Sequence, residues 1–167
     1  MAAAPKPAST RPAATVRWRE ALSDERMAHL LKLAFRQTSR ALQDRLADKG
    51  VQYGHWTLLR VLWQTDGLTQ RQLSEQASVA EPSTFAALRQ MEELGYVTRQ
   101  KVAGNQRQVR VFLTPRGQAL RGASVAAAEE VNRLALAGLA AEDVAAARRV
   151  LIEIVANLAS AESGSLA

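Results

Sequence analysis

The chain has 167 residues, 47% of them hydrophobic, which suits one domain with appended elements. It carries 22 Lys and Arg against 16 Asp and Glu, and the resulting net charge of +6 favours nucleic acid or another anionic surface as partner. The absence of cysteine excludes disulfides, thiolate zinc sites and thiol-based redox switches. No secretory signal and no run of about 18 apolar residues is found, so we expect a cytoplasmic protein without a membrane span.

The first 50 residues are predicted to form a flexible tail followed by one long helix. Residues 1–16 are mostly Ala, Pro, Ser and Thr, a composition that buries too little apolar surface to become ordered. Within residues 17–50, apolar side chains recur at helical spacing on more than one side, which predicts contact with two bodies and a dimerisation region. Trp18 either pins the tail to the folded body or forms an aromatic wall over a ligand pocket.

A second helix is predicted over residues 53–64, where apolar side chains again recur at helical spacing. His55 lies on the apolar side of this helix. Two interpretations are open for it: a hydrogen-bonded core histidine, or, together with Tyr53, a polar group inside an otherwise apolar ligand crevice.

Residues 68–95 have the pattern of a helix-turn-helix unit. Thr69 and Gln72 have the capping-box spacing at the start of a helix over residues 70–76. A turn of about three residues leads to a helix over residues 82–94, and Gly95 follows as a left-handed stop. A helix pair joined in this way predicts DNA binding through its second helix.

The second helix of the pair is predicted to be a recognition helix. Its predicted inward stripe consists of Phe85, Leu88, Met91 and Leu94. Its predicted DNA contacts are small or polar outward positions: Pro82, Ser83, Thr84, Ala87 and Gln90. No Arg, Lys or Asn precedes Arg89 in this helix, so we expect modest direct readout, with much of the affinity coming from phosphates and groove shape.

A basic β-hairpin is predicted after the recognition helix. Strands over residues 96–101 and 108–113 flank a turn that contains Gly104, and no acidic residue occurs between Glu93 and Glu129. The predicted DNA contacts of this wing are Arg99, Lys101, Arg107 and Arg110. Arg107, near the tip, suits a narrow minor groove, and the alternative for it is a solvated surface arginine. Residues 51–114 are thus predicted to be a winged helix-turn-helix domain in a mainly α-helical protein with a small β-hairpin wing.

Two alanine-rich helices are predicted at the C-terminal end. One begins at Thr114-Pro115 and reaches about residue 136, and the other runs from residue 140 or 141 to 158. The predicted buried face of the last helix is Val144, Ala147, Leu151, Ile154, Val155 and Leu158. We assign residues 115–160 to the dimerisation region and expect residues 161–167 to fray.

The sequence resembles the MarR family of winged-helix transcription regulators over about residues 22–160. Residues 68–73 resemble the family's entry from strand to helix, and residues 81–95 look like the recognition helix of the SlyA branch. Residues 97–100, then 105–107, then Leu113-Thr114 are similar to the family's wing signature. Two positions depart from the family pattern. Asn105 stands at the signature acid, and Ala86 stands where the SlyA-like pattern has an arginine, so we expect weaker sequence readout and a less rigid wing arginine.

The resemblance implies a homodimeric repressor that binds a palindromic operator in double-stranded DNA and releases it when a small aromatic carboxylate binds. The family's effector crevice maps onto Trp18, Thr38, Tyr53 and His55. The N-terminal tryptophan and His55 also resemble the BpsR/NicR-like branch, which implies a hydroxynicotinate-like effector beside the salicylate-like alternative.

Other functional classes find less support in the residues. His29 and His55 are the two histidines, and with no cysteine and no Gly-rich phosphate loop they assemble no catalytic constellation, so we predict no enzyme activity, no cofactor and no metal site. The alternative to a nucleoid-associated DNA-binding regulator is a winged-helix module that binds protein without binding DNA. The basic hairpin favours DNA.

Overall fold

The computed structural model describes residues 22, 24–102 and 105–164, and for residues 102, 105–108 and 162–164 it describes the backbone alone. The predictions for the tail (residues 1–16) and for Trp18 lie outside the described residues. Two units are distinguished along the chain, with the division after Arg40, inside helix α2 (Met27–Ala47).

The part of α2 that lies in the first unit keeps two large apolar side chains exposed. Phe35 is 65% exposed and Met27 is 54% exposed. Glu25 and His29 form an ion pair one helical turn apart at the start of the helix. The predicted long N-terminal helix is confirmed, and it ends at a turn in which Gly50 has a φ of +71°.

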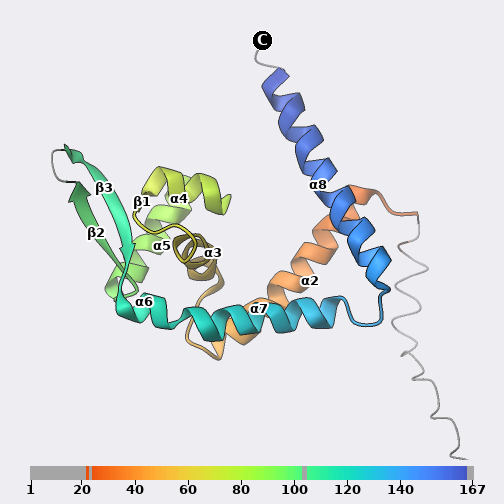
Figure 1. Cartoon of the computed structure of the whole chain (residues 1–167), viewed down its shortest axis with the longest axis horizontal. Helices are drawn as coiled ribbons and strands as arrows, with labels where there is room; N and C mark the ends of the chain where they lie inside the picture. Colours follow the sequence, from red (N-terminus) through yellow and green to blue (C-terminus); the bar gives the residue numbers. More distant parts are fainter. Residues whose placement is uncertain (1–21, 23, 103–104, 165–167) are drawn as a thin grey trace, which may run out of the picture. The chain divides into compact units, whose positions relative to one another are not determined.

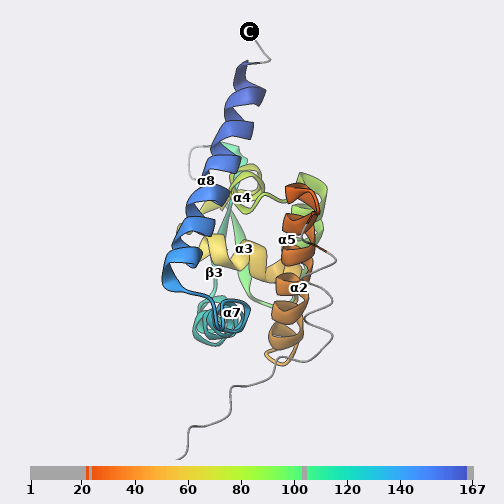
Figure 2. The same ribbon diagram turned by 90° about the vertical axis from the view of Figure 1, so that its right-hand side faces the viewer.

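The second unit contains a winged helix-turn-helix arrangement (Figures 1 and 2). Its three helices α3, α4 and α5 contact one another, and β1, β2 and β3 form an antiparallel sheet in the described part of the chain with the order β1-β3-β2. The register pairs Leu68 with Val111 and Val97 with Leu113. The bounds are α3 (Tyr53–Leu62), β1 (Leu68–Thr69), α4 (Gln70–Ala77), α5 (Glu81–Glu93), β2 (Val97–Val102) and β3 (Asn105–Leu113). The predicted fold class is confirmed.

One apolar core joins these helices to the sheet. The helical spacing of apolar residues in α3 places five of its side chains in this core, and Leu58 and Leu59 are fully buried there. Leu73 of α4 and Leu88 of α5 are also fully buried and complete the helical layer. Burial of this kind contributes about 1.5–3 kcal/mol for each large aliphatic side chain, so it holds the helix-turn-helix at a fixed angle to the wing.

The helix predicted to continue from Thr114 to about residue 136 is divided into α6 (Pro115–Ala119) and α7 (Arg121–Ala135), which meet at Leu120. Thr114 caps α6 by accepting a hydrogen bond from the Gly117 backbone N–H at 3.0 Å. The Gly117 carbonyl accepts a hydrogen bond from the Trp63 indole N–H at 3.1 Å. A Cβ atom on Gly117 would collide with the Tyr96 carbonyl oxygen, so the start of α6 packs tightly against the core.

The last helix, α8 (Ala141–Gly164), extends beyond its predicted end at residue 158. Its apolar face was predicted to be buried, but within one chain it is largely exposed. Of the residues predicted to form that face, Val155, Leu158 and Leu151 are 70%, 63% and 44% exposed. Within the described residues, no helix has the length and apolar character required to cross a membrane.

Candidate DNA-binding surface

The two helices of the helix-turn-helix are oriented by local backbone interactions. The predicted capping box is present: Thr69 Oγ1 accepts from the Gln72 backbone N–H at 3.3 Å, and Gln72 Oε1 accepts from the Thr69 backbone N–H at 3.0 Å. In the turn between α4 and α5, Ser78 has a φ of 52°, a left-handed conformation that allows Val79 N–H to donate to the Ser74 carbonyl at 3.0 Å. These contacts fix where α5 begins.

The outer face of α5 begins with small and polar side chains. Pro82 and Ser83 are exposed in its first turn, as predicted, and Gln90 is exposed two turns later, whereas Ala87 is half-buried against the core. The acidic Glu81 lies at the helix N-terminus, where the helix dipole favours negative charge. The outward side chains of the first turn, Pro82 and Ser83, are short enough for the helix backbone to approach the floor of a groove.

The predicted inward stripe of α5 was wrong at two positions, and the predicted outward position of Thr84 was also wrong. Thr84 is fully buried, and its Oγ1 has no hydrogen-bond partner among the described residues. Phe85 is 51% exposed and Leu94 is 38% exposed, while Leu88 and Met91 are buried as expected. The buried stripe therefore runs through Thr84, Leu88 and Met91, and Phe85 joins the exposed surface of the recognition helix.

A buried polar side chain, His55 at the start of α3, contacts the recognition helix from inside the domain. His55 is 1% exposed, and its Nε2 lies 3.1 Å from Oε1 of Gln90 on α5. Its ring packs edge-on against Tyr96, with ring centroids 6.3 Å apart, and the Tyr96 hydroxyl donates to the Gly50 carbonyl at 3.3 Å. Burial lowers the pKa of His55 below its ordinary value of 6.5, so the ring is neutral at pH 7.

Two of the four predicted wing cations have partners inside the chain. Arg99 on β2 donates from Nε and Nη2 to Glu92 Oε2 of α5, at 2.9 and 2.5 Å, and this ion pair lowers the pKa of the Glu92 carboxyl. Arg110 on β3 donates from Nη1 to the Gly67 carbonyl at 2.7 Å. Arg99 therefore connects the wing to α5, and Arg110 connects β3 to the loop that precedes β1, roles that sequence reasoning did not assign. The sequence signal for the ion pair was the spacing of seven residues between Glu92 and Arg99 across a glycine turn.

The other two wing cations lie farther along the hairpin. Lys101 on β2 is exposed. The backbone of Arg107 lies in β3, but its side chain is outside the described part of the structure, as is that of Asn105. The wing residues therefore form two groups, one held against the helices and one toward the tip of the hairpin.

The residues predicted to contact an effector occupy different places. Tyr53 lines a cavity of about 520 Å³ at the junction of α2 and α3, together with Gln43, Ala47, Gly50 and Gln52. His55 is not among the lining residues of this cavity. Thr38 lies on α2, where its hydroxyl donates to the Ala34 carbonyl at 2.9 Å.

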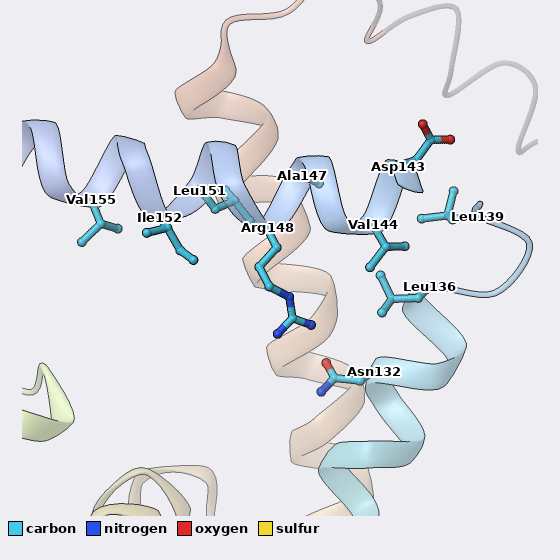
Figure 3. Close-up of a pocket in the computed structure, with 10 residues that line it drawn as sticks. All are labelled: Asn132, Leu136, Leu139, Asp143, Val144, Ala147, Arg148, Leu151, Ile152 and Val155. Atoms are coloured by element: carbon cyan, nitrogen blue, oxygen red, sulfur yellow. The ribbon is translucent and has the colours of Figure 1, made fainter. Parts of the chain in front are cut away.

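A second cavity, of about 720 Å³, lies between the end of α7 and α8 (Figure 3). Its walls are mostly aliphatic, with Leu136 and Val144 directed toward each other and Arg148 extending toward Asn132 (Figure 3). Several lining side chains are among the exposed residues of α8, including Leu151, which is 44% exposed. An open apolar groove of this kind indicates a surface that another body covers.

Sequence comparisons place these elements among known proteins. The sequence profile described as the MarR family matches residues 51–109. The chain is 27% identical over 99 residues to the HTH-type transcriptional regulator TtmR of Methylorubrum extorquens, covering 59% of this chain and 51% of TtmR, about half the length of that relative. It is 31% identical over 101 residues to the homoprotocatechuate degradative operon repressor of Escherichia coli, covering 60% of this chain and 68% of the repressor.

Solved structures are similar over more of the chain. The transcriptional regulator PA3341 matches with a TM-score of 0.73 and 30% identity, covering 81% of this chain and 99% of that chain. The Mycobacterium tuberculosis protein Rv2887, solved in complex with salicylic acid, matches with a TM-score of 0.65 and 27% identity, covering 78% and 97%. Bordetella bronchiseptica BpsR, whose DNA binding is regulated by 6-hydroxynicotinic acid, matches with a TM-score of 0.72 and 19% identity, covering 78% of this chain and 99% of that chain. At this identity the match supports the fold alone.

Proposed function

The chain belongs to the MarR family of transcriptional regulators, and on that premise we propose that it is a homodimeric repressor that binds a palindromic operator and releases it when a small aromatic carboxylate binds. The observation that carries this proposal is the juxtaposition of an exposed, small-residue face on α5 with a basic hairpin directly behind it. The absence of acidic residues between Glu93 and Glu129 gives the hairpin an excess of positive charge.

Each subunit would place α5 in a major groove and its hairpin in the adjacent minor groove. Pro82, Ser83, Ala87 and Gln90 would face bases or phosphates, and the symmetry of a dimer would set the two copies of α5 about 34 Å apart, one turn of DNA. On the wing, Lys101 and Arg107 would contact the backbone or the minor groove. Arg99 and Arg110 keep N–H groups beyond those used internally, and these would add phosphate contacts.

The dimer interface would use the exposed apolar face of α8 and the groove between α7 and α8. A set of large aliphatic side chains on one helix face, each about half or more exposed, is costly to leave in water and is typical of a surface covered by a second copy. The 720 Å³ groove is continuous with this face, because Leu151, Ile152 and Val155 belong to both.

The proposed effector is a hydroxynicotinate-like or salicylate-like aromatic acid. Support comes from the salicylic acid complex of Rv2887 and from the cavity beside Tyr53, while Trp18 and Thr38 remain proposed contacts by family resemblance. His55 would reach an effector after giving up its hydrogen bond to Gln90, so effector binding and the recognition helix would compete for one donor. Coupling between such sites is typically worth about 1–3 kcal/mol.

Fluorescence anisotropy with DNA from the region upstream of the protein's own gene tests this function. We expect saturable binding with a steep inverse dependence on salt concentration, and weaker binding after addition of salicylate or 6-hydroxynicotinate. Absence of binding to every upstream fragment, at low salt, would refute DNA recognition. Binding to protein partners with a flat salt dependence would instead support a winged-helix module for protein contact.

A further inference from the structure

His55 is a buried polar side chain whose only described partner is on the recognition helix. The ring is enclosed by the α3 and α5 helices and by Tyr96, and its exposed fraction is 1%. Nε2 lies 3.1 Å from Gln90 Oε1, while Nδ1 is buried with no hydrogen-bond partner among the described residues. A polar ring in this position costs free energy unless the one hydrogen bond that it makes is well formed.

The geometry selects one protonation form of the ring. Gln90 presents its amide oxygen to Nε2, and an oxygen accepts, so Nε2 carries the proton and donates. Nδ1 is then the bare nitrogen, because a proton on it would be a buried donor without an acceptor. Desolvation by the surrounding core disfavours the doubly protonated ring for the same reason.

The Nε2–H donor of His55 determines the orientation of the Gln90 side-chain amide. Gln90 lies on the exposed side of α5, but its oxygen is directed inward to His55. The NH₂ group on the same planar amide is therefore directed away from the core. We propose that His55 is a positioning residue that holds the Gln90 amide so that its NH₂ group, and not its oxygen, faces DNA. This inference rests on the proposed function of α5 in a major groove.

The orientation has a consequence for base recognition. A freely rotating glutamine reads adenine through a pair of hydrogen bonds, one accepted by its oxygen and one donated by its NH₂ group. With the oxygen held by His55, Gln90 offers a donor alone, so it fits an acceptor in the major groove: guanine O6 or N7, adenine N7, or thymine O4, whereas cytosine presents only its N4 donor there. His55, though remote from the duplex, would in this way limit the bases that the helix accepts.

Selection from a randomised duplex library tests the proposal in the full-length protein. The variants are Gln90→Ala, which removes the amide, and His55→Phe, which keeps an aromatic ring against Tyr96 but removes the donor. His29→Phe and Gln64→Ala make the same chemical changes at exposed positions outside this pair and serve as controls. We expect the wild type to prefer guanine, adenine or thymine over cytosine at one position in each half-site, and both His55→Phe and Gln90→Ala to lose that preference at that position alone.

The remaining outcomes are distinguishable. Failure of the wild type to enrich any sequence would count against the proposed function itself, whereas a preference that Gln90→Ala removes and His55→Phe preserves would overturn the role of His55. The double variant should lose no more than either single variant. The controls should keep the wild-type preference.

Two measurements do not depend on the folding of His55→Phe. Gln90→Glu keeps an oxygen to accept from His55 but replaces the NH₂ donor, so we expect the preference to move toward cytosine, whose N4 is a donor. Retention of the wild-type preference by this variant would contradict the proposal. Nitrogen-15 NMR of the imidazole should find Nε2 protonated and Nδ1 bare, and the opposite tautomer would overturn the proposal because it would turn the Gln90 NH₂ group inward.

Discussion

The exposed face of α8 leads to a quantitative prediction about assembly. Val155 is 70% exposed, the largest exposed fraction among the large hydrophobic side chains of the described residues. Complete burial of a valine side chain stabilises by about 1.5–3 kcal/mol, so covering the exposed part of Val155 in a dimer contributes roughly 1–2 kcal/mol per subunit. Two symmetric copies contribute roughly 2–4 kcal/mol, which corresponds to a factor of about 30 to 700 in the dimer dissociation constant.

Val155→Asp loses this contribution and also forces a carboxylate into an apolar contact, so we expect the dissociation constant to rise by at least roughly 30-fold. Sedimentation equilibrium over a range of protein concentrations measures it directly. Val109→Asp makes the same change at a valine that is 39% exposed on β3 and should leave the dimer unchanged. Equal association of Val155→Asp and the wild type would remove α8 from the proposed interface.

Three further predictions concern the winged domain. Gly117→Ala should lower the free energy of unfolding by about 1–3 kcal/mol in urea denaturation, because its Cβ would collide with the Tyr96 carbonyl; an unchanged urea midpoint would contradict that packing. The exposed aromatic side chain of Phe85 on α5 is suited to contact a thymine methyl group, so replacing thymine with uracil in the bound DNA should weaken binding by the wild type and not by Phe85→Ala. An equal effect of uracil on both proteins would refute this contact. The pKa of His55 is lowered in the folded chain, so below pH 6.5 the unfolded chain binds more protons than the folded chain, and stability falls as the pH drops toward the folded-state pKa, with a slope of at most about 1.4 kcal/mol per pH unit. His55→Phe should remove this slope between pH 6.5 and the folded-state pKa, and an unchanged pH dependence of unfolding would show that another group is responsible.

The elements with strong local signals could be predicted from the sequence. The Thr69–Gln72 capping box and the glycine stop at Gly95 are set by a few neighbouring residues, and both are present in the structure. The winged helix-turn-helix followed from their order and from the basic hairpin. Local chemistry was enough at these places because the relevant contacts span only a few residues.

The errors occurred where a contact distant in the sequence decides the outcome. Phe85 was predicted to be buried because it is more hydrophobic than Thr84, but the direction of α5 is fixed by Leu88 and Met91, and the stripe that includes them passes through Thr84. The close approach of Gly117 to Tyr96 likewise joins residues 21 positions apart, and no local pattern indicates it or the break between α6 and α7 at Leu120.

Interactions between elements were the other limit. His55 had two open interpretations, and its hydrogen bond to Gln90 joins residues 35 positions apart, so the choice between them needed the structure. Arg99 and Arg110 were predicted as DNA contacts from charge alone, whereas the structure also gives each an internal partner. For α8, the amphipathic pattern predicted an apolar face correctly, but a single chain does not bury it.

Hydroxyl-radical footprinting of the protein on a bound upstream fragment tests the central claim most directly. A pair of recognition helices flanked by basic wings predicts protection with two-fold symmetry: two half-sites about one helical turn apart, each bordered by a protected minor groove. Protection confined to a single half-site, or two protected half-sites without bordering minor-groove protection, would contradict the account of α5 and the hairpin acting together on one duplex.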